Sequence, residues 1–138
     1  VSMLEPFIDT VIICTATALV ITISGVLQQD PATGLYVWDE AAGQIATAND
    51  GSIIGGADVK AQTEVVIDKI VEILAEADMG LDDVVQTTVY LQSLDDYAGM
   101  NEVYSARFQE PYLARTTVRA DLAGAGPLVE IFAIAGRA

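Results

Sequence analysis

Residues 57 to 92 combine a helix-forming segment with a strand-forming segment that follows it almost directly. In ADVKAQTEVVIDKIVEILAEADMG (57–80), apolar side chains recur at helical spacing, at Val59, Val66, Ile70, Ile73, Leu74 and Ala77. Asp58 can cap the start of this helix, and Gly80 follows its last turn as a C-terminal cap. The next segment, VVQTTVYLQ (84–92), is uncharged and β-rich, which predicts an interior strand. A helix between strands favours parallel neighbouring strands joined by a right-handed crossover.

The N-terminal part of the chain carries no charge from Thr10 to Gln29, so a membrane span has to be weighed. The run is rich in Thr, Val and Ile and lacks flanking Lys or Arg, unlike a spanning helix or a signal peptide. Two β-strands fit better, at about Thr10–Thr15 and Leu19–Ser24. We therefore expect a soluble, cytoplasmic protein with no membrane segment.

The C-terminal half predicts a second helix and two more strands. Ser93 is the expected N-cap of a helix that extends to about Phe108. Two strands follow, at about 115–122 and 128–135. The order ββ(β)-α-β-α-ββ predicts an α+β fold in which two helices pack on one face of a mixed sheet. A chain of 138 residues suits a single domain of this kind.

The composition excludes several kinds of chemistry. The net charge is −14, from 20 acidic and 6 basic residues, which opposes binding to the phosphate backbone of a nucleic acid. Because the chain has no histidine, it lacks the usual general base near neutral pH, the histidine-containing metal sites and the Ser-His or Cys-His nucleophile pairs. Cys14 is the only cysteine, so neither an intrachain disulfide nor a thiolate metal cluster can form. Carboxylates, hydroxyls, backbone groups and six cations remain.

Glu130 lies inside LVEIFAIA (128–135), the most apolar run of the C-terminal half. An unpaired buried charge is costly, so a carboxylate at this position needs a reason. A strand period of two puts Glu130, Phe132 and Ile134 on one face and the intervening residues on the other. Since the two helices can cover only one face, the second face needs another cover, and self-association supplies it. Glu130 would then lie in or beside a subunit interface.

Arg115 and Glu130 each have two interpretations. Arg115 is either a strand-end arginine paired with an acidic side chain, or a planar fork that binds a small carboxylate ligand. Glu130 is either the structural partner of an arginine, or a carboxylate that holds a water molecule or accepts a proton. The residues alone leave both alternatives open.

Several motifs occur in one order along the chain: SG, DPATG, the segment from AQTEVV to NEVY, ARTTV and LVEIFAIA. Together they resemble the Rid family, the reactive intermediate deaminases, also called YjgF-type proteins and often labelled endoribonuclease L-PSP. The resemblance covers roughly residues 19–135, and its most specific part is ARTTV with VEI, whose glutamate follows the arginine by fifteen positions. It implies a chorismate-mutase-like α+β fold that assembles as a homotrimer, with ligand sites in the clefts between subunits.

The resemblance also implies an activity and residues for it. Rid proteins hydrolyse imines or enamines of 2-keto acids to the keto acid and ammonia, without a cofactor or metal, so the expected partner is a small carboxylate substrate. The carboxylate-binding arginine of the family corresponds to Arg115 and its water-orienting glutamate to Glu130. Gly25 and Asn101 match further family positions near the cleft. Thr117 stands where deaminase-type members carry Ser or Cys.

Departures from the family pattern predict a divergent subgroup. Val26 replaces a glutamine, Phe132 replaces a second carboxylate on the Glu130 face, and residues 35–56 contain a longer insertion than usual. These changes favour a substrate that is larger or more apolar than one with a side chain of two or three carbons.

A function of another class remains open beside the deaminase. A trimer could keep the arginine clamp without efficient turnover and serve as a non-catalytic, small-carboxylate-binding or regulatory protein. RNA cleavage, which the inherited label suggests, fits poorly with a net charge of −14 and no histidine.

Overall fold

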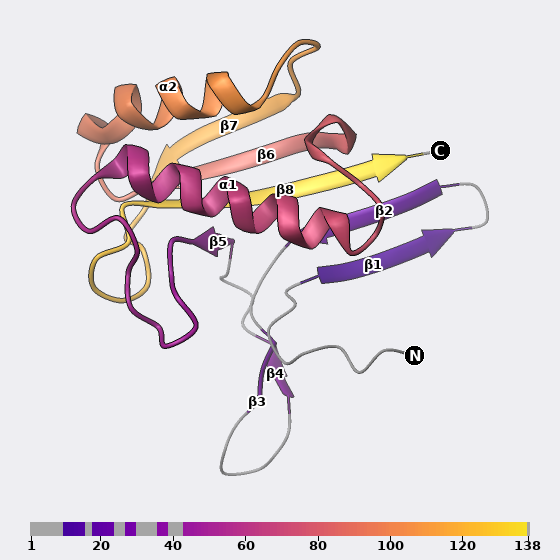
Figure 1. Cartoon of the computed structure of the whole chain (residues 1–138), viewed down its shortest axis with the longest axis horizontal. Helices are drawn as coiled ribbons and strands as arrows, with labels where there is room; N and C mark the ends of the chain where they lie inside the picture. The colour runs from indigo at the N-terminus through magenta and orange to yellow at the C-terminus, as the bar shows by residue number, and fades with distance from the viewer. Residues whose placement is uncertain (1–9, 16–17, 24–26, 30–35, 39–42, 138) are drawn as a thin grey trace.

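The computed structural model describes residues 10–15, 18–23, 27–29, 36–38 and 43–137, and the side chains of residues 43–136 (Figure 1). Its strands are β1 (Thr10–Thr15), β2 (Ala18–Ile23), β3 (Leu27–Gln29), β4 (Tyr36–Trp38), β5 (Gln44–Ile45), β6 (Val84–Leu91), β7 (Ala114–Arg119) and β8 (Val129–Arg137). Its helices are α1 (Val59–Ala75) and α2 (Tyr97–Arg107), with 3₁₀ turns at Leu81–Asp83 and Leu94–Asp96. From α1 onward the predicted order of elements is confirmed, whereas the structure has five strands before α1 and the expected order had two or three. Both N-terminal strands lie within one residue of their expected bounds.

The sheet is mixed, as predicted. Its strands follow the order β1-β2-β8-β6-β7, with β5 paired to β8 beside this path, while β3 and β4 pair separately. Strands β6 and β7 run parallel and α2 connects them; the other described pairs are antiparallel. Strand β7 therefore lies at an edge of the described sheet, next to the helix that precedes it in the chain.

Both helices lie on one face of this sheet (Figure 1). Helix α1 packs against α2 and β8. Beneath the helices, Val129, Ile131 and Ala133 of β8 are completely buried. The alternate residues Phe132 and Ile134 point to the other face and are half-buried. The predicted two-face pattern of this strand is thus confirmed, and no helix among the described residues covers the second face.

Helix α1 begins as the sequence predicts but ends differently. The Asp58 carboxylate caps it by accepting hydrogen bonds from the backbone N–H groups of Lys60 and Ala61. The predicted cap at Gly80 is wrong, because the backbone turns at Asp78, whose φ is 55°. The N–H groups of Asp78 and Met79 close the helix end on carbonyls of its last turn, at 3.0 and 2.9 Å. An Asp tolerates this left-handed conformation, so no glycine is needed there.

The two helices approach each other closely. A Cβ atom on Gly99 of α2 would lie 2.8 Å from a methyl carbon of Val59 in α1, so a side chain at residue 99 would push the helices apart. Arg107 of α2 forms ion pairs with two acidic side chains of α1, and Lys60 pairs with Glu102. These contacts fix α2, and with it the side chains that α2 presents to β7.

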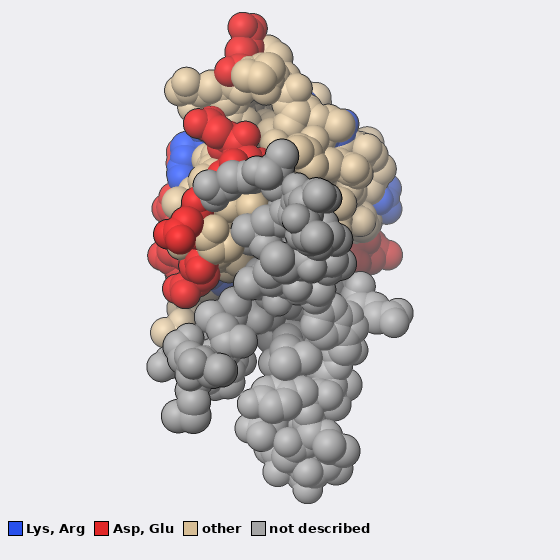
Figure 2. All heavy atoms as spheres, turned by 90° about the vertical axis from the view of Figure 1, so that its right-hand side faces the viewer, with Lys and Arg blue, Asp and Glu red and all other residues tan. Residues whose placement is uncertain are grey.

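The outer surface of the helix layer is acidic. Exposed carboxylates recur every four residues along α1 and at its C-cap, at Asp68, Glu72 and Glu76. Asp and Glu side chains gather along the left-hand side of Figure 2. Within the described part of the chain, neither helix is long and apolar enough to span a bilayer.

Candidate functional site

Glu130 lies in the middle of the sheet, on β8, where its register neighbours are Tyr90 of β6 and Ile45 of β5. Glu130 is 8% exposed, and its Oε1 accepts a hydrogen bond from the backbone N–H of Gly43 at 2.7 Å. A Cβ atom on residue 43 would come within 2.9 Å of the Glu130 Cγ, so only glycine fits this close approach. The Gly43 amide thus holds one oxygen of a buried side chain in place.

Arg115 lies at the start of edge strand β7, beside α2. Its guanidinium carbon is 4.6 Å from the centre of the Tyr104 ring, and its Nη2 donates to the Tyr97 hydroxyl at 3.3 Å. No carboxylate among the described residues forms an ion pair with Arg115, in contrast to Arg107, which pairs with two. An arginine whose guanidinium stacks on an aromatic ring keeps its N–H donors available for an anion. The structural interpretation of Arg115 as half of an ion pair therefore does not hold for this part of the chain.

Arg115 and Glu130 lie on opposite faces of the sheet. Arg115 is in register with Thr87, whose hydroxyl lies 2.6 Å from the Tyr104 hydroxyl beneath α2. Glu130 is in register with Tyr90, three residues further along β6 and so on the other face. A single copy of the chain does not bring the two groups into one pocket.

Thr117 shares the helix-side face of β7 with Arg115, because two positions separate them. Its register neighbour on β6 is Val89, which is completely buried. The Thr117 Oγ1 is itself buried and has no hydrogen-bond partner among the described residues. Buried hydroxyls are rarely left unsatisfied in native proteins, and the exceptions need a functional or structural explanation. One strand face thus offers a cation and an unsatisfied hydroxyl.

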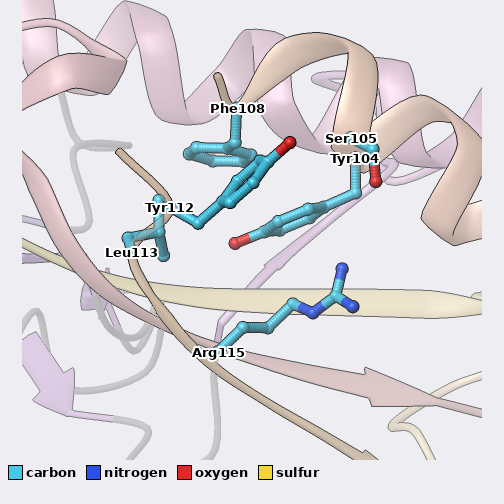
Figure 3. A pocket seen from close by; sticks show the side chains of 6 residues that line it. All are labelled: Tyr104, Ser105, Phe108, Tyr112, Leu113 and Arg115. Carbon is cyan, nitrogen blue, oxygen red and sulfur yellow. The ribbon is translucent and has the colours of Figure 1, made fainter. Parts of the chain in front are cut away.

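A cavity of about 310 Å³ adjoins Arg115 (Figure 3). It lies between the end of α2, the following loop and the start of β7, and is lined by Tyr104, Ser105, Phe108, Tyr112, Leu113 and Arg115. The Tyr104 ring stacks on Phe108, with centroids 4.4 Å apart, and lies between it and the guanidinium (Figure 3). Burial raises the pKa of the Tyr104 phenol, although the hydrogen bond with Thr87 and the charge of Arg115 act in the opposite direction. The neutral Tyr104 ring therefore contacts both the Arg115 guanidinium and the apolar residues that line the cavity.

Residues 19–136 match the family model described as endoribonuclease L-PSP. The matched region is most of the chain and includes Arg115 and Glu130. The chain belongs to the Rid family. The resemblance carried by the sequence motifs is thereby confirmed.

Rid proteins from distant organisms share the sequence and the fold of this chain. A RutC family protein from Pyrococcus abyssi is 47% identical over 95 residues, which are 68% of this chain and 74% of that protein. The structure of RidA from an Antarctic Psychrobacter has 28% identity and a TM-score of 0.70 over 97% of this chain and 90% of its own. A structure from Thermotoga maritima has 26% identity and a TM-score of 0.72 over 99% and 90%. The mixed sheet with two helices is thus the architecture of these Rid proteins.

The site residues that the Rid resemblance suggested do not all lie on the same face of the sheet as Arg115. Asn101 lies on α2 one turn after Tyr97 and three residues before Tyr104, so helical spacing puts it on the surface that contacts Arg115. Thr117 lies on the Arg115 face of β7, and Glu130 lies on the opposite face of the sheet. Gly25 is outside the described residues, as is the neighbouring Val26.

Sequence reasoning missed the tyrosines that hold Arg115 in this Rid protein. Tyr97 and Tyr104 recur with Phe108 at helical spacing, which predicts packing against the sheet. Tyr104 does pack, since only 6% of it is exposed, but its ring also lies against the guanidinium. Tyr97 is 42% exposed and still contacts Arg115 through its hydroxyl. The signal available in the sequence was a repeated tyrosine on the helix that precedes the arginine.

Proposed function

We propose that this Rid protein hydrolyses reactive 2-imino acids and their enamines to 2-keto acids and ammonia, in clefts between the subunits of a homotrimer. The main observation behind the proposal is the environment of the Arg115 side chain. Its guanidinium has no carboxylate partner among the described residues, and it adjoins a cavity of about 310 Å³. The chain has 20 acidic and 6 basic residues, so an arginine at a cavity with no acidic partner in the described part of the chain is best explained by an anionic ligand.

The proposed ligand group at Arg115 is the carboxylate of the imino acid. A guanidinium presents two parallel N–H donors to the two oxygens of a carboxylate, which fixes the orientation of the ligand. Tyr104 and Tyr97 restrict the guanidinium before the ligand binds. Thr117 lies on the same strand face, but its hydroxyl is buried in one copy of the chain and Thr117 does not line the cavity, so its part in binding requires Arg115 to shift when the ligand enters.

Glu130 would reach this ligand from a second copy of the chain. Because Arg115 and Glu130 lie on opposite faces of one sheet, a site that uses both must join two subunits. Water adds to the C=N carbon, and one proton of that water passes through the Glu130 carboxylate to the nitrogen, which gives an adduct with one hydroxyl and one amino group on the same carbon. The hydroxyl proton of the adduct then passes by the same carboxylate to the amino nitrogen as the C–N bond breaks and the C=O bond forms, which releases ammonia and the keto acid. An imine is already electrophilic, so positioning and modest acid–base help suffice without a cofactor.

A coupled assay tests this proposal. An amino-acid oxidase generates the imino acid in situ, and release of the keto acid is timed with and without the protein. Arg115→Ala should weaken binding of a 2-keto acid by roughly 10–150-fold, because a charge-assisted contact is lost. Glu130→Gln should leave that binding intact and slow turnover by about 10²-fold or more.

Arg119→Ala is a matched control for Arg115→Ala. It removes an exposed cation from the same strand, four residues away and on the same strand face. Binding and turnover should both stay near wild type in this variant. Equal losses in Arg119→Ala and Arg115→Ala would mean that net charge, not a specific clamp, explains the ligand affinity.

A non-catalytic carboxylate-binding or regulatory trimer is the second candidate. The observation that favours it is that one Glu130 oxygen already accepts from the Gly43 amide, as expected of a structural carboxylate. This candidate predicts Arg115-dependent binding of keto acids, no acceleration of keto-acid release with any 2-imino acid, and no effect of Glu130→Gln on either measurement.

RNA cleavage is not supported by the same features. The acidic outer surface of the helix layer and the net charge of −14 repel a phosphate backbone (Figure 2). A histidine-free chain also lacks the side chain that most often serves as the general base near neutral pH.

A further inference from the structure

The cavity beside Arg115 has an apolar wall that binding of a carboxylate does not use. Phe108 is 3% exposed, Tyr104 is 6% exposed, and Leu113 packs partly against the core. Tyr112 is different, because 72% of it is exposed although its ring faces the cavity (Figure 3). A large aromatic side chain held at the protein surface gains little from folding and is available for contact with a ligand.

The apolar wall and the cation are parts of one arrangement. Tyr104 contacts the guanidinium of Arg115 at 4.6 Å and the ring of Phe108 at 4.4 Å, so a ligand whose carboxylate reaches Arg115 comes next to aromatic rings. The cavity volume of about 310 Å³ is at the lower end of the range of roughly 300–1,000 Å³ typical of small-molecule pockets. A side chain the size of a phenyl ring fits that volume, whereas a methyl group would leave most of the wall in contact with water.

We propose that this cavity is the subsite for the substrate side chain, and that the preferred substrates are 2-imino acids with an aromatic side chain. The proposal rests on the proposed function, since it takes Arg115 as the carboxylate clamp. The substrate ring lies against Phe108, Tyr112 and Leu113, while its carboxylate binds the guanidinium on the other side of Tyr104. Offset or edge-to-face contacts between aromatic rings then add to the burial of apolar surface.

Binding of stable keto acids tests the subsite separately from turnover. Isothermal titration calorimetry of the full chain with phenylpyruvate and with pyruvate should show affinity for phenylpyruvate that is at least about 10-fold higher, because a phenyl ring loses most of its contact with water. Tyr112→Ala should lower affinity for phenylpyruvate several-fold and leave pyruvate unchanged. Tyr112 is mostly exposed, so this variant keeps the fold.

A variant that fills the cavity gives the sharper result. Ser105 is exposed on α2 and lines the cavity, whereas the next residue, Ala106, is exposed and does not line it. Ser105→Trp should abolish the preference for phenylpyruvate and retain pyruvate binding. Ala106→Trp, the matched control, adds the same side chain to the same helix and should retain the preference.

The outcomes separate the two proposals. If pyruvate binds in an Arg115-dependent way but phenylpyruvate binds no more tightly, or if Ser105→Trp leaves the preference intact, the aromatic subsite is wrong and the clamp stands. If neither keto acid binds, or if both bind equally well to Arg115→Ala, the clamp itself fails and the subsite fails with it. A preference for the long aliphatic keto acid 2-oxooctanoate over phenylpyruvate would also overturn the aromatic assignment.

Discussion

Glu130 and Arg115 are both charged groups in largely apolar surroundings, but their environments differ. Glu130 is in the interior of the sheet, where a backbone amide of a glycine that has no room for a side chain holds one of its oxygens. Arg115 is on an edge strand, held by the ring of one tyrosine and the hydroxyl of another. The carboxylate has backbone support without a ligand, whereas the charge of the guanidinium is not balanced by an acidic group among the described residues. This difference supports the proposal that Arg115 captures the ligand, while the position of Glu130 is set by the fold.

The difference also has an energetic side. A backbone amide offers a donor whose position is set by the fold, so the geometry at Glu130 tolerates little change in the chain around it. A cation on an aromatic ring contributes only about 0.5–1 kcal/mol at an exposed site, so the guanidinium can adjust when an anion arrives. Substitutions near Glu130 should therefore have larger effects than substitutions near Arg115.

The largest effect should come from Gly43→Ala. A Cβ atom there would lie 2.9 Å from the Glu130 Cγ and 3.0 Å from the backbone carbon of Ile131, so either the carboxylate or the strand must shift. Such overpacking costs about 1–3 kcal/mol of stability. If Glu130 orients the attacking water, we expect turnover to fall on the order of 10²-fold while binding of a keto acid changes little. Urea unfolding and the oxidase-coupled assay measure the two effects.

Gly80→Ala is the control for this substitution. Gly80 has extended dihedral angles, and a Cβ atom added to it would have no atom of a residue beyond its chain neighbours within 4 Å, so alanine should be accepted there. A Gly43→Ala protein with wild-type stability and turnover would show that the close contact with Glu130 is unimportant for both.

The sequence predicted best what depends on neighbouring residues. The helix periodicity of α1, the β-rich run of β6 and the two faces of β8 are local patterns, and all three appear in the structure. The cap predicted at Gly80 failed for a local reason too, because Asp78 adopts the left-handed conformation two residues earlier. Glycine is the commonest residue at such a cap but not the only one.

The sequence did not predict the pairing register between neighbouring strands, and the register decides which residues of different strands share a face. A period of two tells which residues of β8 share a face with Glu130, but not which residues of β7 do. That relation depends on how both strands register with β6, where Thr87 meets Arg115 and Tyr90 meets Glu130. A shift of one residue in either pairing would reverse the outcome. Whether Arg115 and Glu130 share one face of the sheet was therefore beyond what spacing could establish.

A smaller effect is expected at Tyr104, where two variants separate packing from support of the arginine. Tyr104→Phe keeps the ring beneath Arg115 but leaves the buried Thr87 hydroxyl without its 2.6 Å partner, which should cost about 1–3 kcal/mol of stability with little change in keto-acid affinity. Tyr104→Leu also removes the ring, so affinity should fall by about 2–5-fold. Thermal unfolding and calorimetric titration give the two readouts. Equal affinities in the two variants would show that the ring does not help to hold the guanidinium.

The smallest effect should come from Thr117→Val, and its sign distinguishes a binding residue from a structural one. The hydroxyl is buried without a partner in the described structure, so replacing it by a methyl group of similar shape should leave stability unchanged or raise it by up to about 1 kcal/mol. If the hydroxyl donates to the ligand, the same variant should bind a keto acid about 3-fold more weakly. Thr116→Val on the opposite, exposed face of the strand should change neither quantity. A hydroxyl that serves only the fold would give the reverse result, with Thr117→Val losing stability and keeping its affinity. A gain in stability together with a loss of affinity is the result expected if the ligand completes the unsatisfied group at Thr117, which would link the edge of the sheet to the site proposed at Arg115.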